Sequence, residues 1–325
     1  MQAITVLLSS IGRRSQLVQC FREAFRELNV AGRVIGVDLD PEHAPAAHIA
    51  DACFRVPRCT HAEFIPAVLR ICRQEQVRLL VPTIDTELMA YAQHRSEFSA
   101  AGTKVIVSGP DTIAIAGDKV KTHRFLVEHG FPTVRQGSPA GVLADMTKWQ
   151  FPLIAKPADG SASLGVVKVD SLAMLRELAE TKPDLIVQEY AMGQEHTVNI
   201  LMDGGRCICA VPHCRLETRG GEVSKGITRK NEQVMAMAKA VAEKLPGADG
   251  PLNLQCFIAD NSRPQITEIN ARFGGGFPLA NYAGAKFPRW LIEPLIQRAT
   301  TASFADWKDK LLMLRYDSAV FVAAN

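Results

Sequence analysis

The hydrophobic pattern of the first 110 residues predicts strands and helices in alternation. Short apolar runs rich in β-branched residues predict four strands, at residues 3–8, 33–37, 78–81 and 104–107. Between them, apolar residues recur at helical spacing over residues 15–28, 61–72 and 86–98. Strands that alternate with helices in this way form a parallel sheet with helices on both faces, so we expect a doubly wound α/β domain.

The pattern changes at residues 108–111, where Ser-Gly-Pro-Asp predicts a turn. We expect a helix from about 118 to 130, strands at 151–156, 166–169 and 185–189, and a helix at 172–180. Residues 196–223 predict antiparallel hairpins with glycine turns at 203–205 and 219–221. The remaining expected elements are a helix at 230–245, strands at 252–258 and 265–270, helices to about 299 and a strand-like segment at 311–322.

Composition and charge narrow the class of protein. The 325 residues, 47% hydrophobic and 22% charged, are enough for two or three ordered domains. No apolar run reaches the ~18–20 residues that span a bilayer. The opening segment MQAITVLLSS resembles a strand more than a signal peptide, so we expect a cytoplasmic protein without a membrane partner. The 37 basic and 34 acidic residues are interspersed and leave a net charge of +3, which argues against nucleic-acid binding.

The eight cysteines are expected to be reduced and mostly buried, because a chain of this size builds its own core. Cys207, Cys209, His213 and Cys214 lie close together in sequence, but their spacing matches no zinc template. In a strand, Cys207 and Cys209 would share a face with Val211, which favours core packing. Three histidines are expected to be structural or peripheral: His123, His196 and His213.

Two common nucleotide-binding motifs are absent. The chain has no G-x-x-x-x-G-K-[ST] loop, and residues 9–14, which follow the first predicted strand, lack the G-x-G-x-x-G fingerprint. A third type of phosphate site is indicated by Lys156, which ends the apolar segment 153–155 and must bring its charge to water or to an anion. A solvent-exposed lysine is the simpler interpretation of this residue alone. The small residues of the following loop, 159–165, allow consecutive N–H groups to surround phosphate oxygens.

Two further segments carry clustered polar residues. Residues 188–190 end a predicted strand, so their backbone can hydrogen-bond a purine edge, and Glu195 follows at a distance that suits ribose hydroxyls. In the predicted strand pair 252–257 and 266–270, alternation places Ile266, Glu268 and Asn270 on one face, with Gln255 opposite Glu268 and Asn270. Such a set of oxygen ligands with one formal charge suits Mg²⁺ shared with ATP phosphates. Two polar strand faces in solvent are the alternative.

In their order along the chain, these features resemble the ATP-grasp ligases, in particular the carbamoyl-phosphate-synthase-like branch. The resemblance rests on Gly117-Asp118-Lys119, the Lys156 strand with its loop, residues 189–195, and Gln255 with Glu268-Ile269-Asn270-Ala271-Arg272. It covers about residues 1–300, including a pre-ATP-grasp segment at 82–88. It implies a pre-ATP-grasp domain at 1–112, a lid subdomain at 113–190 and a C-terminal subdomain at 191–325, the last two forming an α+β ATP-grasp fold.

The resemblance also implies a role for individual residues, with ATP and Mg²⁺ (one or two ions, Mn²⁺ as a substitute) as cofactors. ATP would be bound by Lys119, Lys156, Gly160, Ser161, Ser163, Gly165, Glu189, Tyr190 and Glu195. The metal ligands would be Gln255, Glu268 and Asn270. The catalytic residues would be Lys156, Arg272 and, less directly, Arg215. The chain departs from many family members at two positions. They often have an acid where this chain has Gln255, and a proline where it has Ala271.

The resemblance implies a ligase that phosphorylates a carboxylate and joins the acyl phosphate to an amine or thiol. Its partners would then be small-molecule carboxylate and amine substrates, and a homodimer is one expected assembly. Ser10, Arg13 and Asp85, near strand ends of the first domain, are expected to contribute to the substrate cleft. Two alternatives stay open: a carbamoyl-phosphate-type reaction on bicarbonate, and a nucleotide-binding sensor or scaffold without turnover.

Overall fold

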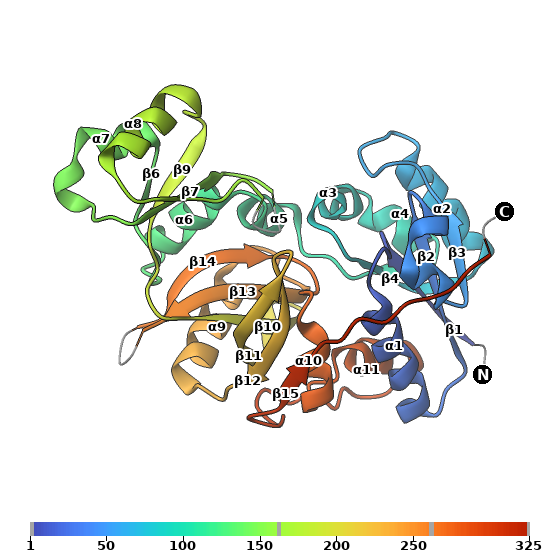
Figure 1. Ribbon diagram of the computed structural model, residues 1–325. Coiled ribbons are helices and arrows are strands. Elements are labelled where there is room, and N and C mark those ends of the chain that lie inside the picture. The colour runs from blue at the N-terminus through green and yellow to red at the C-terminus, as the bar shows by residue number, and fades with distance from the viewer. Residues whose placement is uncertain (1–2, 161–163, 260–262, 324–325) are drawn as a thin grey trace.

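A five-stranded parallel sheet forms the first part of the chain (Figure 1). The computed structural model describes residues 3–160, 164–259 and 263–323. The strand order is β3-β2-β1-β4-β5, and each neighbouring pair is parallel, which confirms the doubly wound α/β class. The strands are β1 (Ile4–Ser9), β2 (Gly32–Asp38), β3 (Ala52–Arg55), β4 (Val77–Pro82) and β5 (Lys104–Val105).

Helices cover both faces of this sheet because their apolar stripes match its two buried faces. They are α1 (Ser15–Leu28), α2 (Phe64–Gln74), α3 (Asp85–Gln93) and α4 (Arg95–Ala100), with short 3₁₀ turns η1 (Pro41–His43) and η2 (Pro45–His48). The strand order reverses between β1 and β4. The carboxyl ends of these two strands therefore border the crevice in which doubly wound folds bind ligands.

Two local expectations for this region were wrong, and one strand was missed. The predicted helix 86–98 is two helices that meet at His94. Strand β3 was not predicted, because it is too short to show a periodic pattern. The expected turn at 108–111 is instead the start of helix α5 (Pro110–Ala116), with Gly109 as N-cap. Proline is favoured in the first turn of a helix because its missing N–H has no intrahelical partner there, so Pro110 begins the helix and does not prevent it.

A six-stranded antiparallel sheet forms the base of the second half of the chain, in the order β14-β13-β10-β11-β12-β15. Helix α9 (Glu232–Lys244) packs on one face, and helices α10 (Phe277–Ala283) and α11 (Phe287–Ile292), followed by η4 (Glu293–Ile296), lie between the sheet and α1 (Figure 1). The strands are β10 (Gln194–Asp203), β11 (Arg206–Arg219), β12 (Glu222–Thr228), β13 (Gly250–Ile258), β14 (Gln265–Asn270) and β15 (Leu312–Leu314).

A smaller four-stranded sheet stands apart from the other two (Figure 1). Its order is β6-β9-β7-β8, with helices α7 (Pro139–Ala144) and α8 (Leu172–Thr181) packed on its apolar face. Helices α5 and α6 (Lys119–Glu128) lead into this sheet but contact β14 of the large sheet. Together the three sheets confirm the expected α/β and α+β architecture. The strands are β6 (Gln136–Gly137), β7 (Leu153–Pro157), β8 (Val167–Val169) and β9 (Leu185–Glu189), and η3 (Met146–Lys148) precedes β7.

Two β-bulges in the large sheet overturn predictions based on strict alternation. The bulge in β11 pairs Met202 with Cys207 but Leu201 with Cys209, so the two cysteines lie on opposite faces and do not share one. The bulge between β13 and β14 pairs Cys256 with Ile266 but Gln255 with Glu268. Ile266 therefore lies in the core with Cys256, away from the face that carries Glu268.

The structure also tests two further expectations, that the cysteines are reduced and that residues 311–322 form a strand. All eight cysteines are free, and burial raises the pKa of Cys72 and Cys256, among others, to about 12. The strand-like segment 311–322 forms only the three-residue β15, since the residues after Arg315 are exposed and unpaired with the sheet. Within the described ranges, no helix is both long enough and apolar enough to cross a membrane.

Candidate active site

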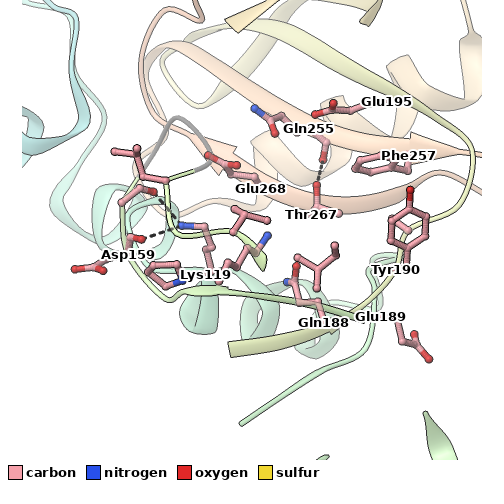
Figure 2. Close-up of a pocket in the computed structure, with 17 residues that line it drawn as sticks. Lys119, Asp159, Gln188, Glu189, Tyr190, Glu195, Gln255, Phe257, Thr267 and Glu268 are labelled. Atoms are coloured by element: carbon pink, nitrogen blue, oxygen red, sulfur yellow. Dashed lines mark hydrogen bonds between the residues drawn. The ribbon is translucent and has the colours of Figure 1, made fainter. Parts of the chain in front are cut away.

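A cavity of about 260 Å³ separates the small sheet from the edge of the large sheet (Figure 2). We name it the lid cavity; β7, β9 and the segment before β8 provide one wall, and β13 and β14 provide the other. Its wall combines apolar side chains with charged groups from both sheets. Eight predicted site residues line it: Lys119, Lys156, Gly160, Glu189, Tyr190, Glu195, Gln255 and Glu268.

Lys156 extends from β7 into the lid cavity, because alternation along the strand buries Ala155 in the core of the small sheet. The pKa of Lys156 is lowered to about 8, mainly by burial and also by the charge of Lys119, while the charges of Glu268 and Glu195 act in the opposite direction. A partly buried ammonium group whose charge is incompletely compensated is suited to an anion. The simple interpretation of a solvent-exposed lysine therefore does not describe Lys156.

Lys119 begins helix α6, whose N-cap Asp118 accepts hydrogen bonds from the N–H groups of Val120 and Lys121. Its Nζ atom donates to the backbone carbonyls of Asp159 and Gly160, at 3.3 Å and 2.9 Å (Figure 2). The predicted glycine-rich loop is thus tied to the second lysine. Gly165 adopts a positive φ of 72° next to the cavity residues Leu164 and Val166. The predicted Ser161 and Ser163 lie outside the described residues.

Glu189 and Tyr190 lie at the end of β9, where the chain passes from the small sheet to the large one. The Glu189 side chain points away from the cavity (Figure 2) and pairs with Arg135, whose backbone N–H donates to Glu189 Oε2 at 3.0 Å. The Glu189 carboxylate is therefore not directed at a ligand in the lid cavity. Tyr190 lines the cavity and is 44% exposed, so its ring provides a flat surface for a planar group.

A second cavity, of about 920 Å³, continues from the lid cavity toward the N-terminal sheet. We name it the central cavity. The two cavities share Lys119, Asp159, Gly160, Glu195, Gln255 and Glu268. The remaining predicted residues Arg215, Asn270 and Arg272 line the central cavity alone, together with Arg14, Thr83 and Asp85 from the carboxyl ends of β1 and β4. The structure thus brings the described predicted residues together around one continuous space, except Gly165, which adjoins it.

Gln255 and Glu268 are cross-strand partners on β13 and β14, as expected. Asn270 is instead the partner of Asn253, to which it donates a hydrogen bond at 3.2 Å, so the predicted pairing of Gln255 with Asn270 was wrong. The side-chain Oδ1 of Asn270 accepts a hydrogen bond from Arg272 Nη2 at 3.1 Å. One carboxylate and two amide oxygens, of which one is already hydrogen-bonded, fit Mg²⁺ only when phosphate and water complete the coordination.

Arg272 is held in place across the cavity by Asp85. Its Nε and Nη2 atoms donate to Asp85 Oδ2 at 3.2 Å and 2.9 Å, and its Nη1 donates to the carbonyl of Phe273 at 3.3 Å. The guanidinium side chain is only 13% exposed. Arg272 is therefore an oriented cation whose position depends on the N-terminal sheet.

The segment 82–85, which ends with Asp85 at the start of α3, is itself fixed by a buried carboxylate that was not among the predicted site residues. Glu87, in the first turn of α3, accepts hydrogen bonds from Ser9 Oγ at 2.6 Å, Ser10 Oγ at 2.7 Å and the N–H of Thr83 at 2.7 Å. It is fully buried, and this desolvation raises the pKa of Glu87 despite these donors. Ser10 thus supports the loop and does not line the central cavity, contrary to expectation.

Glu195 and Arg215 form an ion pair between the two cavities. Burial raises the pKa of Glu195, although the Arg215 charge acts against the increase. Arg215 also donates to the carbonyl of Gly221 at 2.7 Å, and its side chain is 8% exposed. The pair places one anion toward the lid cavity and one cation toward the central cavity.

His213, expected to be structural or peripheral, lies in the wall of the central cavity. It is fully buried, its Nδ1 lies 3.2 Å from the side-chain amide of Asn199, and its Nε2 has no hydrogen-bond partner in the described chain. Burial and the charge of Arg215 lower the pKa of His213 to about 3, so the ring is neutral. Its Nε2 is therefore a buried polar atom without a partner, next to Gly276 in the wall of the central cavity. No spacing rule marks such a residue, because strand pairing creates its position.

The glycine segment after Arg272 lies against charged and polar side chains. A Cβ atom at Gly275 would be 2.6 Å from the carboxyl carbon of Glu222, and one at Gly276 would be 2.8 Å from His213 Nε2. Glu222 in turn accepts hydrogen bonds from Arg14 and from Arg315, each at 3.2 Å. Arg14, rather than the expected Arg13, is the arginine of this segment that lines the central cavity.

Two family models match this chain. The model described as "PylC-like, N-terminal domain" matches residues 6–106, and that described as "ATP-grasp in the biosynthetic pathway with Ter operon" matches residues 181–317. A D-alanine–D-alanine ligase of Ectopseudomonas mendocina is 33% identical over 108 residues, which is 31% of this chain and 34% of that protein. A carbamoyl-phosphate synthase of Methanobrevibacter smithii is 24% identical over 251 residues, which is 72% of this chain and 66% of that protein.

Solved structures show the same fold. The crystal structure of a biotin carboxylase–β,γ-ATP complex from Campylobacter jejuni superposes with a TM-score of 0.72 and 14% identity, over 96% of this chain and 74% of that one. At this identity the likeness establishes the fold. The matched curated relatives are longer than the region they share with this chain, which spans about a third of the first and about two thirds of the second.

Proposed function

We propose that this chain, a member of the ATP-grasp superfamily, is an ATP-dependent ligase that phosphorylates a carboxylate and couples it to an amine or thiol. The observation that carries the proposal is the order in which basic side chains line the two cavities. Lys156 and Lys119 lie in the lid cavity, and Arg272 follows in the central cavity. This order matches a nucleotide whose base lies at Tyr190 and whose phosphates point to Arg272.

Each residue of the site has a role that follows from its surroundings. The buried ammonium of Lys156 and that of Lys119 would bind phosphate oxygens, and the Glu195 carboxylate would accept from ribose hydroxyls. Gln255 and Glu268, with Asn270, would hold Mg²⁺. Bound there, the ion would neutralise charge on the phosphates.

The proposed chemistry needs orientation and charge neutralisation more than covalent help from the protein. A carboxylate oxygen bonds to the γ-phosphorus as the bond to ADP breaks. The amine nitrogen then bonds to the acyl carbon, the C–O bond to phosphate breaks, phosphate leaves with that oxygen, and the nitrogen releases a proton to solvent. Arg272, fixed by Asp85, would stabilise the phosphoryl group in both steps.

An ADP-release screen tests the proposal. The purified protein is incubated with ATP and Mg²⁺ and with amino acids, small carboxylates and amines, and ADP and phosphate are measured. We expect turnover with at least one carboxylate and its loss in Glu268→Gln. The matched control is Glu177→Gln on the exposed side of α8, which should keep full turnover. Equal turnover in a folded Glu268→Gln variant would contradict the assignment.

A second candidate reaction is phosphorylation of bicarbonate. The observation that favours this reaction is the alignment of 72% of this chain with the carbamoyl-phosphate synthase of Methanobrevibacter smithii. The same screen separates the two reactions, because bicarbonate would stimulate ADP release in the absence of any other carboxylate. A protein that binds ATP but releases no ADP with any of these compounds would be a nucleotide sensor or scaffold.

A further inference from the structure

A third cavity, of about 490 Å³, adjoins the central cavity. We name it the distal cavity. It shares Arg14, Glu222, Gly274 and Gly275 with the central cavity, so the space continues past these four residues. Among the described residues it has none in common with the lid cavity, so the central cavity lies between the other two.

The charged side chains around the distal cavity are mostly basic. Three arginines and one glutamate make up the charged residues in the described part of its wall, which leaves an excess of two positive charges: Arg13, Arg14, Arg315 and Glu222. The aromatic rings of Phe273 and Phe277, which also border it, are packed in the core and provide no apolar pocket. Guanidinium groups present several N–H donors to a carboxylate or a phosphate, so a cavity of this charge suits an anion.

Glu222 compensates only part of this positive charge. Its Oε1 accepts a hydrogen bond from Arg14 and its Oε2 accepts one from Arg315, each at 3.2 Å, so two guanidinium groups share one carboxylate. Burial favours a higher pKa for Glu222, but the charges of Arg14 and Arg315 outweigh this effect and lower it overall. Glu222 is therefore ionised and already paired with two cations, and a third cation would be repelled by them.

Two donor groups at the distal cavity have no acceptor. The Arg13 side chain is exposed and forms no ion pair or hydrogen bond with any other described residue, although its charge also acts on Glu222. The Nε atom of Arg315 is buried and has no hydrogen-bond partner within the ranges that the structure describes. A buried N–H group without an acceptor costs free energy, which the oxygen of a bound anion would offset.

Helix α1 begins at the same cavity and adds partial positive charge. Its first two residues, Ser15 and Gln16, line the cavity, and its first turn contains no acidic residue. The N–H groups of Leu17 and Val18 donate to the carbonyl of Arg14. Those of Ser15 and Gln16 find no acceptor in the described chain. The end of the helix therefore reinforces the attraction of the arginines for an anion.

Arg14 links the distal cavity to the proposed reaction centre. It lines both the distal and the central cavity and donates to the carbonyl of Thr83 at 3.3 Å. Its charge interacts with those of Arg272 and Asp85. A donor whose reacting carboxylate lies at Arg272 thus has space to extend past Arg14 into the distal cavity. The excess positive charge there disfavours an ammonium group, so we expect the amine substrate to approach from elsewhere.

We propose that the distal cavity binds a second anionic group of the donor, a carboxylate or a phosphate, with Arg13, Arg315 and the first N–H groups of α1 as its hydrogen-bond donors. The donor is therefore a dicarboxylate or a carboxylate that also carries a phosphate. This inference rests on the proposed function and adds the class of its first substrate.

The binding arm of the test uses calorimetric titration in the presence of Mg²⁺ and a non-hydrolysable ATP analogue. Succinate, glutarate, adipate and 3-phosphonopropionate are compared with monocarboxylates of the same carbon number. We expect at least one dianion to bind about tenfold more tightly, or better, than its monocarboxylate, because it makes additional charge-assisted hydrogen bonds. Arg13→Gln and Ser15→Asp should remove this preference. Ser15→Asp should stay folded, since an acid in the first turn favours a helix.

Arg26→Gln is the matched control for the loss of one positive charge. Arg26 is an exposed arginine of the same helix and does not line the distal cavity, so this variant should keep the preference for dianions. Equal binding of dianions and monocarboxylates by the wild-type protein would overturn the inference. Inorganic phosphate, titrated under the same conditions, tests for a free anion. If it binds in a way that Ser15→Asp abolishes, while dianions have no advantage, the link with the donor is overturned.

The reaction arm uses the ADP-release screen. With the dianion that gives the highest turnover, Ser15→Asp should raise the KM for the donor by about tenfold or more and leave the KM for ATP unchanged. An increase confined to the KM for the amine would mean that the amine substrate places its own carboxylate in the distal cavity, which overturns the assignment to the donor. Absence of any turnover in the wild type would count against the proposed function, while the binding arm still decides this inference.

Discussion

Asp85, the first residue of α3, accepts two hydrogen bonds from the guanidinium of Arg272, which lies 187 positions later on the loop after β14. The contact joins the parallel N-terminal sheet to the antiparallel sheet that carries the proposed metal ligands. It also pairs the charge of Arg272, whose side chain is only 13% exposed, with a carboxylate. The orientation of the proposed catalytic arginine therefore depends on a carboxylate from another sheet.

Asp85→Asn should lower kcat by about 10-fold to 100-fold, because a hydrogen bond to a charged group is worth ~1.5–3 kcal/mol and ~1.4 kcal/mol corresponds to tenfold in rate. The KM for ATP should stay near the wild-type value, since Asp85 does not line the lid cavity. Steady-state kinetics check both numbers. Asp111→Asn, at an exposed position of α5, is the control. A change in the KM for ATP with kcat intact would show that Asp85 does not act through Arg272.

Lys156→Met should weaken ATP binding by at least about tenfold, because a charged phosphate contact is lost. The same substitution should raise the melting temperature, because burial of the ammonium disfavours the folded state, as the lowered pKa of Lys156 shows. Calorimetric titration and differential scanning fluorimetry measure the two effects. Lys168→Met, on the neighbouring strand β8 with an exposed lysine, should change neither. A destabilised Lys156→Met variant would contradict the argument.

The affinity for ATP should fall as pH rises from 7 to 9, because Lys156 has a pKa of about 8 and loses its charge in this range. Between pH 8 and the ordinary lysine pKa of 10.5, the unfolded chain binds more protons at this residue than the folded one. The contribution of Lys156 to stability therefore increases with pH over that window. Lys156→Met should show neither dependence. Titrations at several pH values, in both variants, provide the check.

His213→Phe should raise the KM for the carboxylate or the amine and leave the KM for ATP unchanged, because His213 lines the central cavity and not the lid cavity. Since its pKa is about 3, the kinetic effect should be the same at pH 6 and pH 8. His123→Phe, in the half-buried middle of α6, is the matched control. An effect confined to low pH would mean that His213 acts as a proton donor instead.

Gly275→Ala should reduce turnover at least tenfold, because its methyl group would displace the Glu222 carboxylate and with it Arg14 and Arg315. Gly274→Ala is a close control. Its Cβ would lie 3.4 Å from Asn199 and Asn253, an ordinary contact distance. Kinetics and melting temperatures of the two variants should separate an effect on the site from an effect on folding. Equal behaviour of the two would argue against a role for Glu222.

The sequence predicted those parts of the fold in which one periodicity dominates. Helix α1 and strand β14 have the predicted bounds, because a continuous apolar stripe marks the helix and the turn residues before the strand mark its start. Bulges are different, since one extra residue changes the face of every residue beyond it. That is why Cys207 and Ile266 were assigned to the wrong faces. Likewise, Pro110 predicts a turn, because the sequence alone does not indicate the helix that begins with it.

The candidate site residues were predictable where the alternation of a residue's own strand determines the direction of its side chain. Lys156 and Glu268 follow from alternation and from the motif that surrounds them. Arg14, His213 and Glu222 could not be found in this way, because their significance arises from contacts between distant segments. Glu87 is a similar case, since its four donors come from residues 9–10 and 83–84. Long-range pairing of this kind has no signature in a single sequence.

The hydrogen bonds of Arg14 to Glu222 and of Arg315 to the same carboxylate have a consequence for how this chain can be recombined with its relatives. The charges of three distant segments, at residues 14, 222 and 315, compensate one another. In a chimaera whose first domain comes from another family member, the residues that contact Glu222 and Arg272 from that domain would both be replaced. Domain exchange should therefore succeed only when the donor domain has an arginine at position 14 and an aspartate at position 85, whatever its overall similarity.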